Sequence, residues 1–271
     1  MAGKIAFIGG GVMGEAMIKG VLAKGLVGPQ QVTVAEVVPA RRDALGKTYG
    51  VGVTEHPREA VQDAEMVVLA IKPQSLTEVM AEMKGALSSD QLLVSIIAGA
   101  TLPTLTSGFD HATAVRVMPN TPAQIGQGIS AWTSTPSVTA QQRSAVKSLL
   151  AALGEEIFVA EERYLDMVTA VSGSGPAYVF LFIEAFIDAG VHIGLSREMS
   201  ERLVLQTVAG SALFALESNR HPAELRNMVT SPSGTTTEAL LRLEEGGLRA
   251  ALTNAVLAAY QKSVLLGRPK E

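Results

Sequence analysis

Hydrophobic residues in the first 160 positions form short runs that alternate with longer amphipathic stretches. Such runs are typical of strands covered on both faces, and the stretches between them are typical of crossover helices. The pattern predicts strands at residues 4–8, 32–36, 66–71, 92–97 and 114–117, followed by strands at 129–133 and 156–159. It predicts helices at residues 13–24, 40–49, 75–85 and 101–106.

Beyond about residue 161 the short apolar runs stop, and stretches with helical spacing follow one another. The pattern predicts helices at residues 164–171, 177–193, 197–218, 222–229, 236–246 and 248–266. The change predicts two domains. Residues 1–162 form an α/β domain with a doubly wound sheet, and residues 163–271 form an all-α domain.

The long apolar stretches do not favour a membrane span. The run at 5–11 is too short and lacks a signal-peptide cleavage pattern. Residues 168–187 come nearest in length, but Ser-Gly-Ser-Gly-Pro interrupts them and Glu184 adds a charge. We therefore expect a buried helix there, and a cytoplasmic protein with no membrane partner.

Composition narrows the function classes. The 271 residues carry a net charge of −4 with dispersed Lys and Arg, whereas a nucleic-acid surface needs a clustered basic stripe. The chain has no cysteine, so thiol nucleophiles and thiolate metal sites are excluded. Its four histidines lack the spacing of metal ligands, and no metal is expected.

The segment Gly9-Gly10-Gly11-Val12-Met13-Gly14 fits the pattern G-x-G-x-x-G between a predicted strand and a predicted helix. The first glycine permits the tight turn, the second lets a pyrophosphate approach, and the third lets helix and strand pack closely. An acidic residue is expected roughly 20 residues on, and Glu36 stands there. An ordinary glycine turn would not need that acid. The segment therefore predicts a nicotinamide dinucleotide site of Rossmann type.

The choice of dinucleotide stays open. The Glu36 carboxylate accepts from a ribose 2′-hydroxyl and repels a 2′-phosphate, which favours NADH. Arg41 and Arg42 follow on the next helix, where they either engage that phosphate or serve as solvated surface charges. Both NADPH and NADH are therefore kept, with the local chemistry leaning slightly to NADH.

Three further strands run out into turns marked by Pro or Gly, at residues 70–74, 97–100 and 118–122. These turns are expected at the carboxyl edge of the sheet, where open α/β sheets bind ligands. Together they predict a floor for the nicotinamide half of the cofactor, with Asn120 on a loop stiffened by Pro119 and Pro122.

Two small, hydroxyl-rich segments interrupt the helical part, at residues 172–176 and 230–237. The second opens a helix, so backbone N–H groups and the hydroxyls of Thr235 and Thr236 suit a carboxylate. Ordinary helix capping explains the same residues. Hydrolysis is not indicated, because Ser172 stands where the pattern G-x-S-x-G requires its first glycine.

Four segments are more specific than the glycine turn: V-R-V-M-P-N-T-P at 115–122, S-G-S-G-P-A-Y at 172–178, the stretch 221–236, and L-E-E-G-G-L-R-A-A at 243–251. With these segments the chain resembles the pyrroline-5-carboxylate reductase family, and the resemblance covers residues 5–266. The resemblance implies a Rossmann domain joined to a helical domain that dimerises, with dimers commonly assembling into a decamer. The family commonly prefers NADPH, although NADH use also occurs.

The resemblance also implies residue roles. Taken with the glycine turn and the sheet-edge turns, the expected cofactor-binding residues are Ile8, Gly9, Gly10, Gly11, Val12, Met13, Gly14, Glu36, Ala70, Ile71, Lys72, Pro73, Ala98, Gly99, Ala100 and Asn120. The expected substrate-binding residues are Ser231, Ser233, Gly234, Thr235 and Thr236. The Thr236 hydroxyl would lie near the ring nitrogen, which makes Thr236 the candidate catalytic residue.

Two positions depart from the family pattern. Ser233 stands where the family usually has a second glycine, and Glu36 stands where many members have small or polar residues. The first bears on the substrate loop and the second on the cofactor preference.

The implied reaction is hydride transfer to a cyclic imine, giving L-proline. A protonated imine is already electrophilic, so positioning carries most of the catalysis. One rival is a related hydroxyacid dehydrogenase, but the helix beginning at Pro176 has no lysine through Ile193, where such enzymes use one. A second rival, a non-catalytic dinucleotide sensor, would not need the segment 230–237.

Overall fold

The structure is a computed structural model that describes residues 3–268. Its strands are β1 (Ile5–Ile8), β2 (Val32–Ala35), β3 (Gly52–Thr54), β4 (Met66–Leu69), β5 (Leu92–Ser95), β6 (Ala114–Met118), β7 (Gly128–Ser134) and β8 (Gly154–Phe158). Its α-helices are α1 (Val12–Ala23), α2 (Pro39–Tyr49), α3 (Pro57–Ala60), α4 (Leu76–Met83), α5 (Leu102–Phe109), α6 (Ala140–Ala151), α7 (Tyr164–Val168), α8 (Gly175–His192), α9 (Arg197–Ser218), α10 (Pro222–Met228), α11 (Thr235–Glu245) and α12 (Leu248–Leu266).

The described chain forms two compact units. Unit 1 comprises the chain up to Ser174 together with the segment from Ala259 onwards, and unit 2 comprises Gly175–Ala258. This division falls after the boundary between residues 162 and 163 that the sequence predicts, and it returns the end of α12 to the N-terminal unit. The difference arises because the last turns of α12 pack against unit 1.

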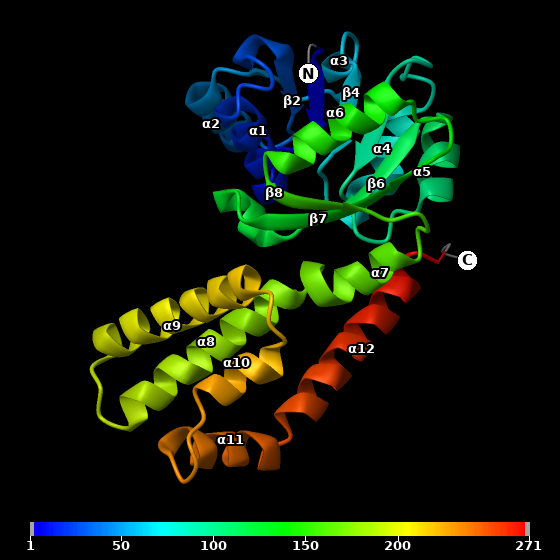
Figure 1. The fold of residues 1–271 in the computed structure, drawn as a ribbon. Helices are drawn as coiled ribbons and strands as arrows, with labels where there is room; N and C mark the ends of the chain where they lie inside the picture. Colours follow the sequence, from blue (N-terminus) through cyan, green and yellow to red (C-terminus); the bar gives the residue numbers. More distant parts are fainter. Residues whose placement is uncertain (1–2, 269–271) are drawn as a thin grey trace. The chain divides into compact units, whose positions relative to one another are not determined.

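Unit 1 is built on one sheet in the order β3-β2-β1-β4-β5-β6-β7-β8 (Figure 1). The strands from β3 to β6 are parallel, β7 runs antiparallel to β6, and β8 is parallel to β7. Parallel neighbours joined by crossover helices on both sides of β1 are the arrangement of a Rossmann-type fold. The predicted fold class is confirmed, and the predicted strand at residues 129–133 is β7. The short strand β3 and the antiparallel direction of β7 are not predicted from the sequence.

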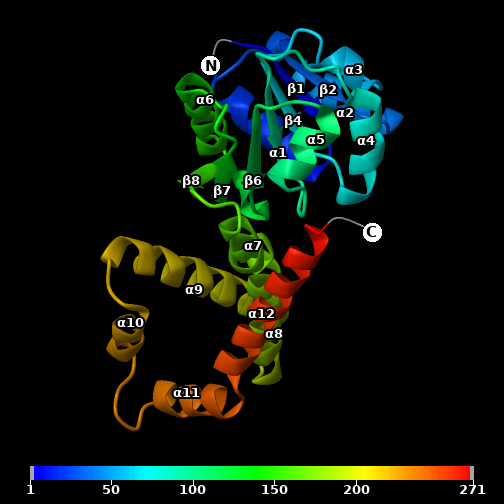
Figure 2. The same cartoon turned by 90° about the vertical axis from the view of Figure 1, so that its right-hand side faces the viewer.

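Alternate residues of each central strand enter two separate hydrophobic cores. In β1, Ile5 and Phe7 pack with residues of α1, α2 and α6, whereas Ala6 and Ile8 pack with residues of α3, α4 and α5. Figure 2 shows α6 and α4 on opposite sides of the sheet. Strands covered on both faces need apolar residues at every position, which explains the continuous apolar runs in the sequence.

The helix α6 is absent from the sequence prediction, although its start carries a recognisable pattern. The Thr139 hydroxyl accepts from the Gln142 N–H at 3.2 Å, and the Gln142 side-chain oxygen accepts from the Thr139 N–H at 2.9 Å. This reciprocal capping box marks a helix N-terminus from sequence alone.

The predicted interruption of the α-helix near residues 172–176 is present, but it takes the form of a π-helical turn followed by a bend at Ser174. Residues Tyr164–His192 form one helical stretch in which Thr169–Gly173 make a π-helical turn, and the Ser174 N–H donates to the Thr169 carbonyl at 2.8 Å. Pro176 has no N–H and its ring crowds the preceding turn. The wider turn accommodates this without ending the helix.

Unit 2 is organised around the pair α8 and α9. The Ser200 hydroxyl of α9 donates to the Ile187 carbonyl of α8 at 2.8 Å, beside Gly190, where a side chain would collide with Ser200. Ser196 caps the start of α9, because its hydroxyl accepts from the Met199 N–H at 3.2 Å. Figure 2 shows α10 and α11 separated from this pair.

Large apolar side chains of unit 2 remain exposed in the described chain. The helical stretch Tyr164–His192 is long and apolar enough to cross a membrane, and 11% of its apolar window is buried. The predicted burial of this stretch is therefore wrong for a single chain. Exposed apolar residues on α8 include Val179, Phe180, Leu181, Phe182 and Phe186. A continuous apolar surface of this kind is typical of a protein–protein interface.

Candidate active site

The glycine turn lies between β1 and α1 at the carboxyl edge of the sheet. Gly9 has φ of +98°, and a Cβ there would lie 2.6 Å from the Ala70 carbonyl oxygen. A Cβ on Gly14 would lie 2.5 Å from the Gly9 carbonyl oxygen, so only glycine lets α1 approach the turn. A Cβ on Gly11 would meet nothing within 4 Å among the described residues.

These three environments match the three glycine roles expected from the sequence. Open space at Gly11 lies beside the start of α1, where N–H groups without intrahelical acceptors favour an anion. The turn therefore fits the pyrophosphate of a dinucleotide.

Glu36 lies one residue beyond β2 and points back to the glycine turn. Its Oε2 accepts from the Gly10 N–H at 2.9 Å and its Oε1 accepts from the Val38 N–H at 2.9 Å. The residue is 9% exposed. The two backbone donors therefore hold the carboxylate beside the turn, as the spacing from Gly14 predicts.

Arg41 and Arg42 of α2 are not solvated surface charges. The Arg41 Nε donates to the Gly10 carbonyl at 2.8 Å, and its Nη2 forms an ion pair with Glu15 of α1. The Arg42 Nη1 donates to the Glu36 carbonyl at 2.6 Å, and its Nη2 lies 3.3 Å from Glu55. Arg41 therefore binds the glycine turn directly, and Arg42 binds the backbone of Glu36, which itself accepts from Gly10.

The three other sheet-edge turns follow β4, β5 and β6, as expected. The residues after β4 include Ala70, whose N–H donates to the Ile8 carbonyl at 2.8 Å and so connects this turn to the end of β1. After β6, the Asn120 Oδ1 accepts from the Ile129 N–H at 2.9 Å and its Nδ2 donates to the Ser172 hydroxyl at 3.2 Å. The Asn120 amide thus joins its loop to β7 and to the π-helical turn.

The turn after β5 packs against the end of α12. Gly99 has φ of +78°, and a Cβ there would lie 2.9 Å from the Leu266 carbonyl oxygen. The last turn of α12 therefore packs against the backbone at Gly99. Because this contact joins residues far apart in sequence, no local pattern predicts it.

A buried ion cluster beneath these turns is absent from the sequence prediction. The Arg116 Nη1 lies 2.9 Å from Glu162 and its Nη2 lies 3.1 Å from Asp166, with 4% of the Arg116 side chain exposed. Glu162 also accepts from the Leu102 N–H at 2.7 Å, and Asp166 accepts from the Ser263 hydroxyl at 2.9 Å. Arg116 is a charged residue inside the apolar run of β6, and a charge in such a position indicates a buried ion pair.

The hydroxyl-rich loop of unit 2 connects α10 to α11, as predicted. The Gly234 N–H donates to the Ser231 carbonyl at 3.1 Å, and the Thr237 hydroxyl donates to the same carbonyl at 2.7 Å. The N–H groups of Thr235 and Thr236 belong to the first turn of α11, before any intrahelical acceptor. N–H groups in this position of a helix favour an anion.

Ser233 occupies a conformation that favours glycine, with φ of +59°. A non-glycine residue there costs about 1–2 kcal/mol relative to the ordinary backbone regions. Glycine adopts this conformation without strain, which explains why a glycine is expected at this position. This chain keeps the same conformation with a serine.

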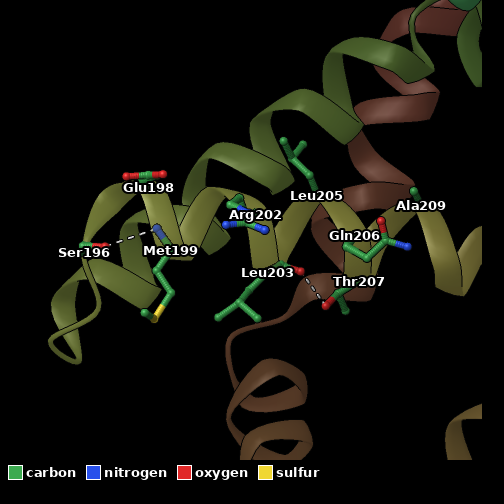
Figure 3. Close-up of a pocket in the computed structure, with 9 residues that line it drawn as sticks. All are labelled: Ser196, Glu198, Met199, Arg202, Leu203, Leu205, Gln206, Thr207 and Ala209. Atoms are coloured by element: carbon green, nitrogen blue, oxygen red, sulfur yellow. Dashed lines mark hydrogen bonds between the residues drawn. The ribbon is translucent and has the colours of Figure 1, made fainter.

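Other features of the described residues do not add a catalytic centre. A hollow along α9 is lined by residues from Ser196 to Ala209 (Figure 3). It contains none of the expected site residues. No group of three or more metal-ligating side chains is found within residues 3–268.

An open α/β sheet with a dinucleotide turn at its carboxyl edge, followed by a helical region, defines a dinucleotide-dependent oxidoreductase. The family model for pyrroline-5-carboxylate reductase dimerisation matches residues 162–266, and the model for NADP oxidoreductase, coenzyme F420-dependent, matches residues 4–99. The chain is 42% identical over 268 residues to the pyrroline-5-carboxylate reductase of Synechocystis sp., covering 99% of this chain and all of the relative. The chain belongs to the pyrroline-5-carboxylate reductase family.

Solved structures agree with this assignment. A pyrroline-5-carboxylate reductase from Coxiella burnetii matches with a TM-score of 0.90 and 36% identity, over 98% of this chain and 99% of that one. The Plasmodium falciparum pyrroline carboxylate reductase, solved with NADP bound, matches with a TM-score of 0.89 and 32% identity, over 98% of both chains. The expected family is therefore confirmed, as is use of NAD(P)H.

Proposed function

We propose that this chain reduces 1-pyrroline-5-carboxylate to L-proline, the last step of proline biosynthesis. Similarity to pyrroline-5-carboxylate reductases over 99% of the chain carries this proposal. The glycine turn supports it independently, because its three glycines meet the steric demands of a dinucleotide site.

We propose that the cofactor lies along the carboxyl edge of the sheet. The residues that would hold it are Ile8 to Gly14, Glu36, Ala70 to Pro73, Ala98 to Ala100, and Asn120. When bound, NAD(P)H would supply a hydride to the C=N carbon of the protonated imine, which becomes C5 of proline, and the C=N π electrons would become the lone pair of the proline nitrogen. The chain's own residues position the two molecules, which is the main requirement of such a reaction.

The loop between α10 and α11 is our candidate for the substrate carboxylate. Ser231, Ser233, Gly234, Thr235 and Thr236 would surround it, with the N–H groups at the start of α11 as donors. The Thr236 hydroxyl would orient the ring nitrogen. The family match over residues 162–266 supports this placement, because it includes the whole loop.

The chain forms oligomers, as its dimerisation region indicates. We propose that residues 163–271 are the dimerisation and substrate domain, that residues 1–162 are the dinucleotide domain, and that homodimers assemble into a homodecamer. The exposed apolar side chains of α8 support a shared helical core. We further propose a soluble enzyme that acts in the cytoplasm.

The testing experiment adds 1-pyrroline-5-carboxylate to the purified chain with NADH or NADPH and measures cofactor consumption and proline together. Matched formation of proline supports the proposal. Consumption with small oxo acids in place of the imine would instead support a hydroxyacid dehydrogenase. Dinucleotide binding with no consumption on any of these substrates would support a sensor.

A further inference from the structure

The surroundings of Glu36 bear on the choice between NADH and NADPH. In Rossmann-type sites the acid after the second strand faces the ribose 2′-position of the adenosine half. Here the Gly10 and Val38 N–H groups each donate to a different oxygen of that carboxylate, both at 2.9 Å. Each oxygen keeps a second lone pair, so the carboxylate still accepts from ribose hydroxyls. A phosphate on the same ribose would face a fixed negative charge.

Arg41 is already neutralised by its neighbours. Its Nη2 pairs with the Glu15 carboxylate, and the Tyr49 hydroxyl donates to the other Glu15 oxygen at 2.9 Å. Burial raises the pKa of Glu15, but hydrogen bonds from Arg41 and Tyr49 outweigh it and the net pKa is lowered. Glu15 therefore stays ionised at neutral pH, and a 2′-phosphate would have to compete with it for the guanidinium.

Arg42 is similarly committed, to the Glu36 carbonyl at 2.6 Å and to Glu55 at 3.3 Å. Around the end of β2, three carboxylates thus accompany two guanidinium groups, which leaves an excess of one negative charge. The two residues after Glu36 are Val37 and Val38, 69% and 52% exposed. Their side chains offer an apolar surface to an adenosine but no hydrogen-bond donor to a phosphate.

We propose that this chain selects NADH over NADPH and that Glu36, held by the Gly10 and Val38 N–H groups, is the specificity-determining residue. This inference rests on the proposed function in one respect, that the chain binds a nicotinamide dinucleotide, and it does not depend on the imine substrate. A Glu36 carboxylate clamped by the backbone cannot swing away to admit a phosphate without breaking both hydrogen bonds. Selection by Arg41 and Arg42 would first require their separation from Glu15 and Glu55.

The test is a fluorescence titration of the full-length protein with NADH and with NADPH, in the absence of imine. We expect the wild type to bind NADH at least tenfold more tightly. Equal binding, or tighter binding of NADPH, would overturn the proposal. Because no imine is present, this result is separate from the reductase assay: tighter NADH binding without proline formation would refute the function and leave the cofactor inference standing.

Variants locate the determinant. Glu36→Gln should reduce the ratio of NADPH to NADH dissociation constants at least fivefold. Glu15→Gln, which releases Arg41 and leaves Glu36 unchanged, should strengthen NADPH binding while leaving NADH binding nearly constant. The matched control Asp43→Asn removes an exposed charge from the same helix α2 and should leave the ratio unchanged. An equal shift of the ratio in Asp43→Asn and Glu36→Gln would show a general charge effect and contradict the assigned role of Glu36.

Discussion

Unit 1 and unit 2 use hydrophobic residues in opposite ways. The sheet of unit 1 buries its apolar side chains between two layers of helices and forms two complete cores. In unit 2, large apolar residues on α8 and α9 such as Phe180, Leu213 and Leu216 are more than half exposed. Unit 1 therefore buries its apolar residues within one chain, whereas unit 2 leaves exposed the helices that we propose a second copy covers.

The largest expected effect comes from breaking the surface of unit 2. Phe180→Asp places a charge on an exposed apolar residue of α8, and desolvating that charge in an interface is costly. We expect dissociation to monomers and a loss of activity of at least 100-fold, measured by light scattering and by the imine assay. The matched control Ile125→Asp changes a 76% exposed residue of unit 1 and should keep the assembly. Intact oligomers of Phe180→Asp would show that α8 is not covered by another chain.

A substitution in the glycine turn of unit 1 should weaken dinucleotide binding and leave the oligomeric assembly unchanged. Gly9→Ala combines φ of +98° with a Cβ 2.6 Å from the Ala70 carbonyl oxygen. We expect dinucleotide affinity to fall at least 100-fold in a fluorescence titration. Gly25→Ala is the matched control, because Gly25 has φ of +62° but a Cβ there meets nothing within 4 Å among the described residues. A comparable loss in Gly25→Ala would point to global unfolding.

Removing the cation of the buried ion cluster, Arg116 with Glu162 and Asp166, should lower the free energy of unfolding. Arg116→Met leaves two partly buried carboxylates without their cation, and removing one partner of a buried pair costs about 3–5 kcal/mol. We expect the free energy of unfolding to fall by about 3 kcal/mol in urea at fixed protein concentration. Arg163→Met removes an exposed pair with Glu161 and should change the free energy of unfolding far less, because water screens that pair. Similar values for the two variants would contradict the structural role of Arg116.

The substrate loop should affect turnover with little change in assembly. Thr236→Ala removes a hydroxyl that we place near the ring nitrogen, and one neutral hydrogen bond is worth about 1 kcal/mol. We expect kcat to fall about fivefold, which corresponds to about 1 kcal/mol, while the dinucleotide dissociation constant stays constant. Thr237→Ser is the control, because it keeps the hydroxyl that donates to the Ser231 carbonyl. Unchanged kcat in Thr236→Ala would remove Thr236 from the mechanism.

The smallest effect is expected at Ser233. Ser233→Gly relieves a left-handed backbone conformation but adds entropy to the unfolded chain, so the two contributions largely offset each other. We expect stability to change by less than about 1 kcal/mol. A rise in the KM for the imine would show that the serine hydroxyl contacts the substrate, whereas an unchanged KM would limit Ser233 to shaping the loop.

The two units also differ in how far the sequence predicts them. In unit 1, apolar strands and glycine spacing are local patterns, so the sheet, the turn and the position of Glu36 follow from sequence alone. The contact of Gly99 with Leu266 and the cluster around Arg116 join distant segments, which no local pattern specifies. In unit 2 the helices are predictable, but apolar periodicity does not distinguish burial within the chain from burial by a partner. For that reason the stretch around α8 was expected to be buried.

Isotope transfer distinguishes hydride transfer from the nicotinamide to the imine carbon from any other route to proline. Purified protein is incubated with 1-pyrroline-5-carboxylate and NADH that carries deuterium in both positions at C4, and the product is analysed by mass spectrometry. We expect proline with one deuterium at C5 and an equal amount of oxidised cofactor. Proline without deuterium, or cofactor oxidation without proline, would contradict it.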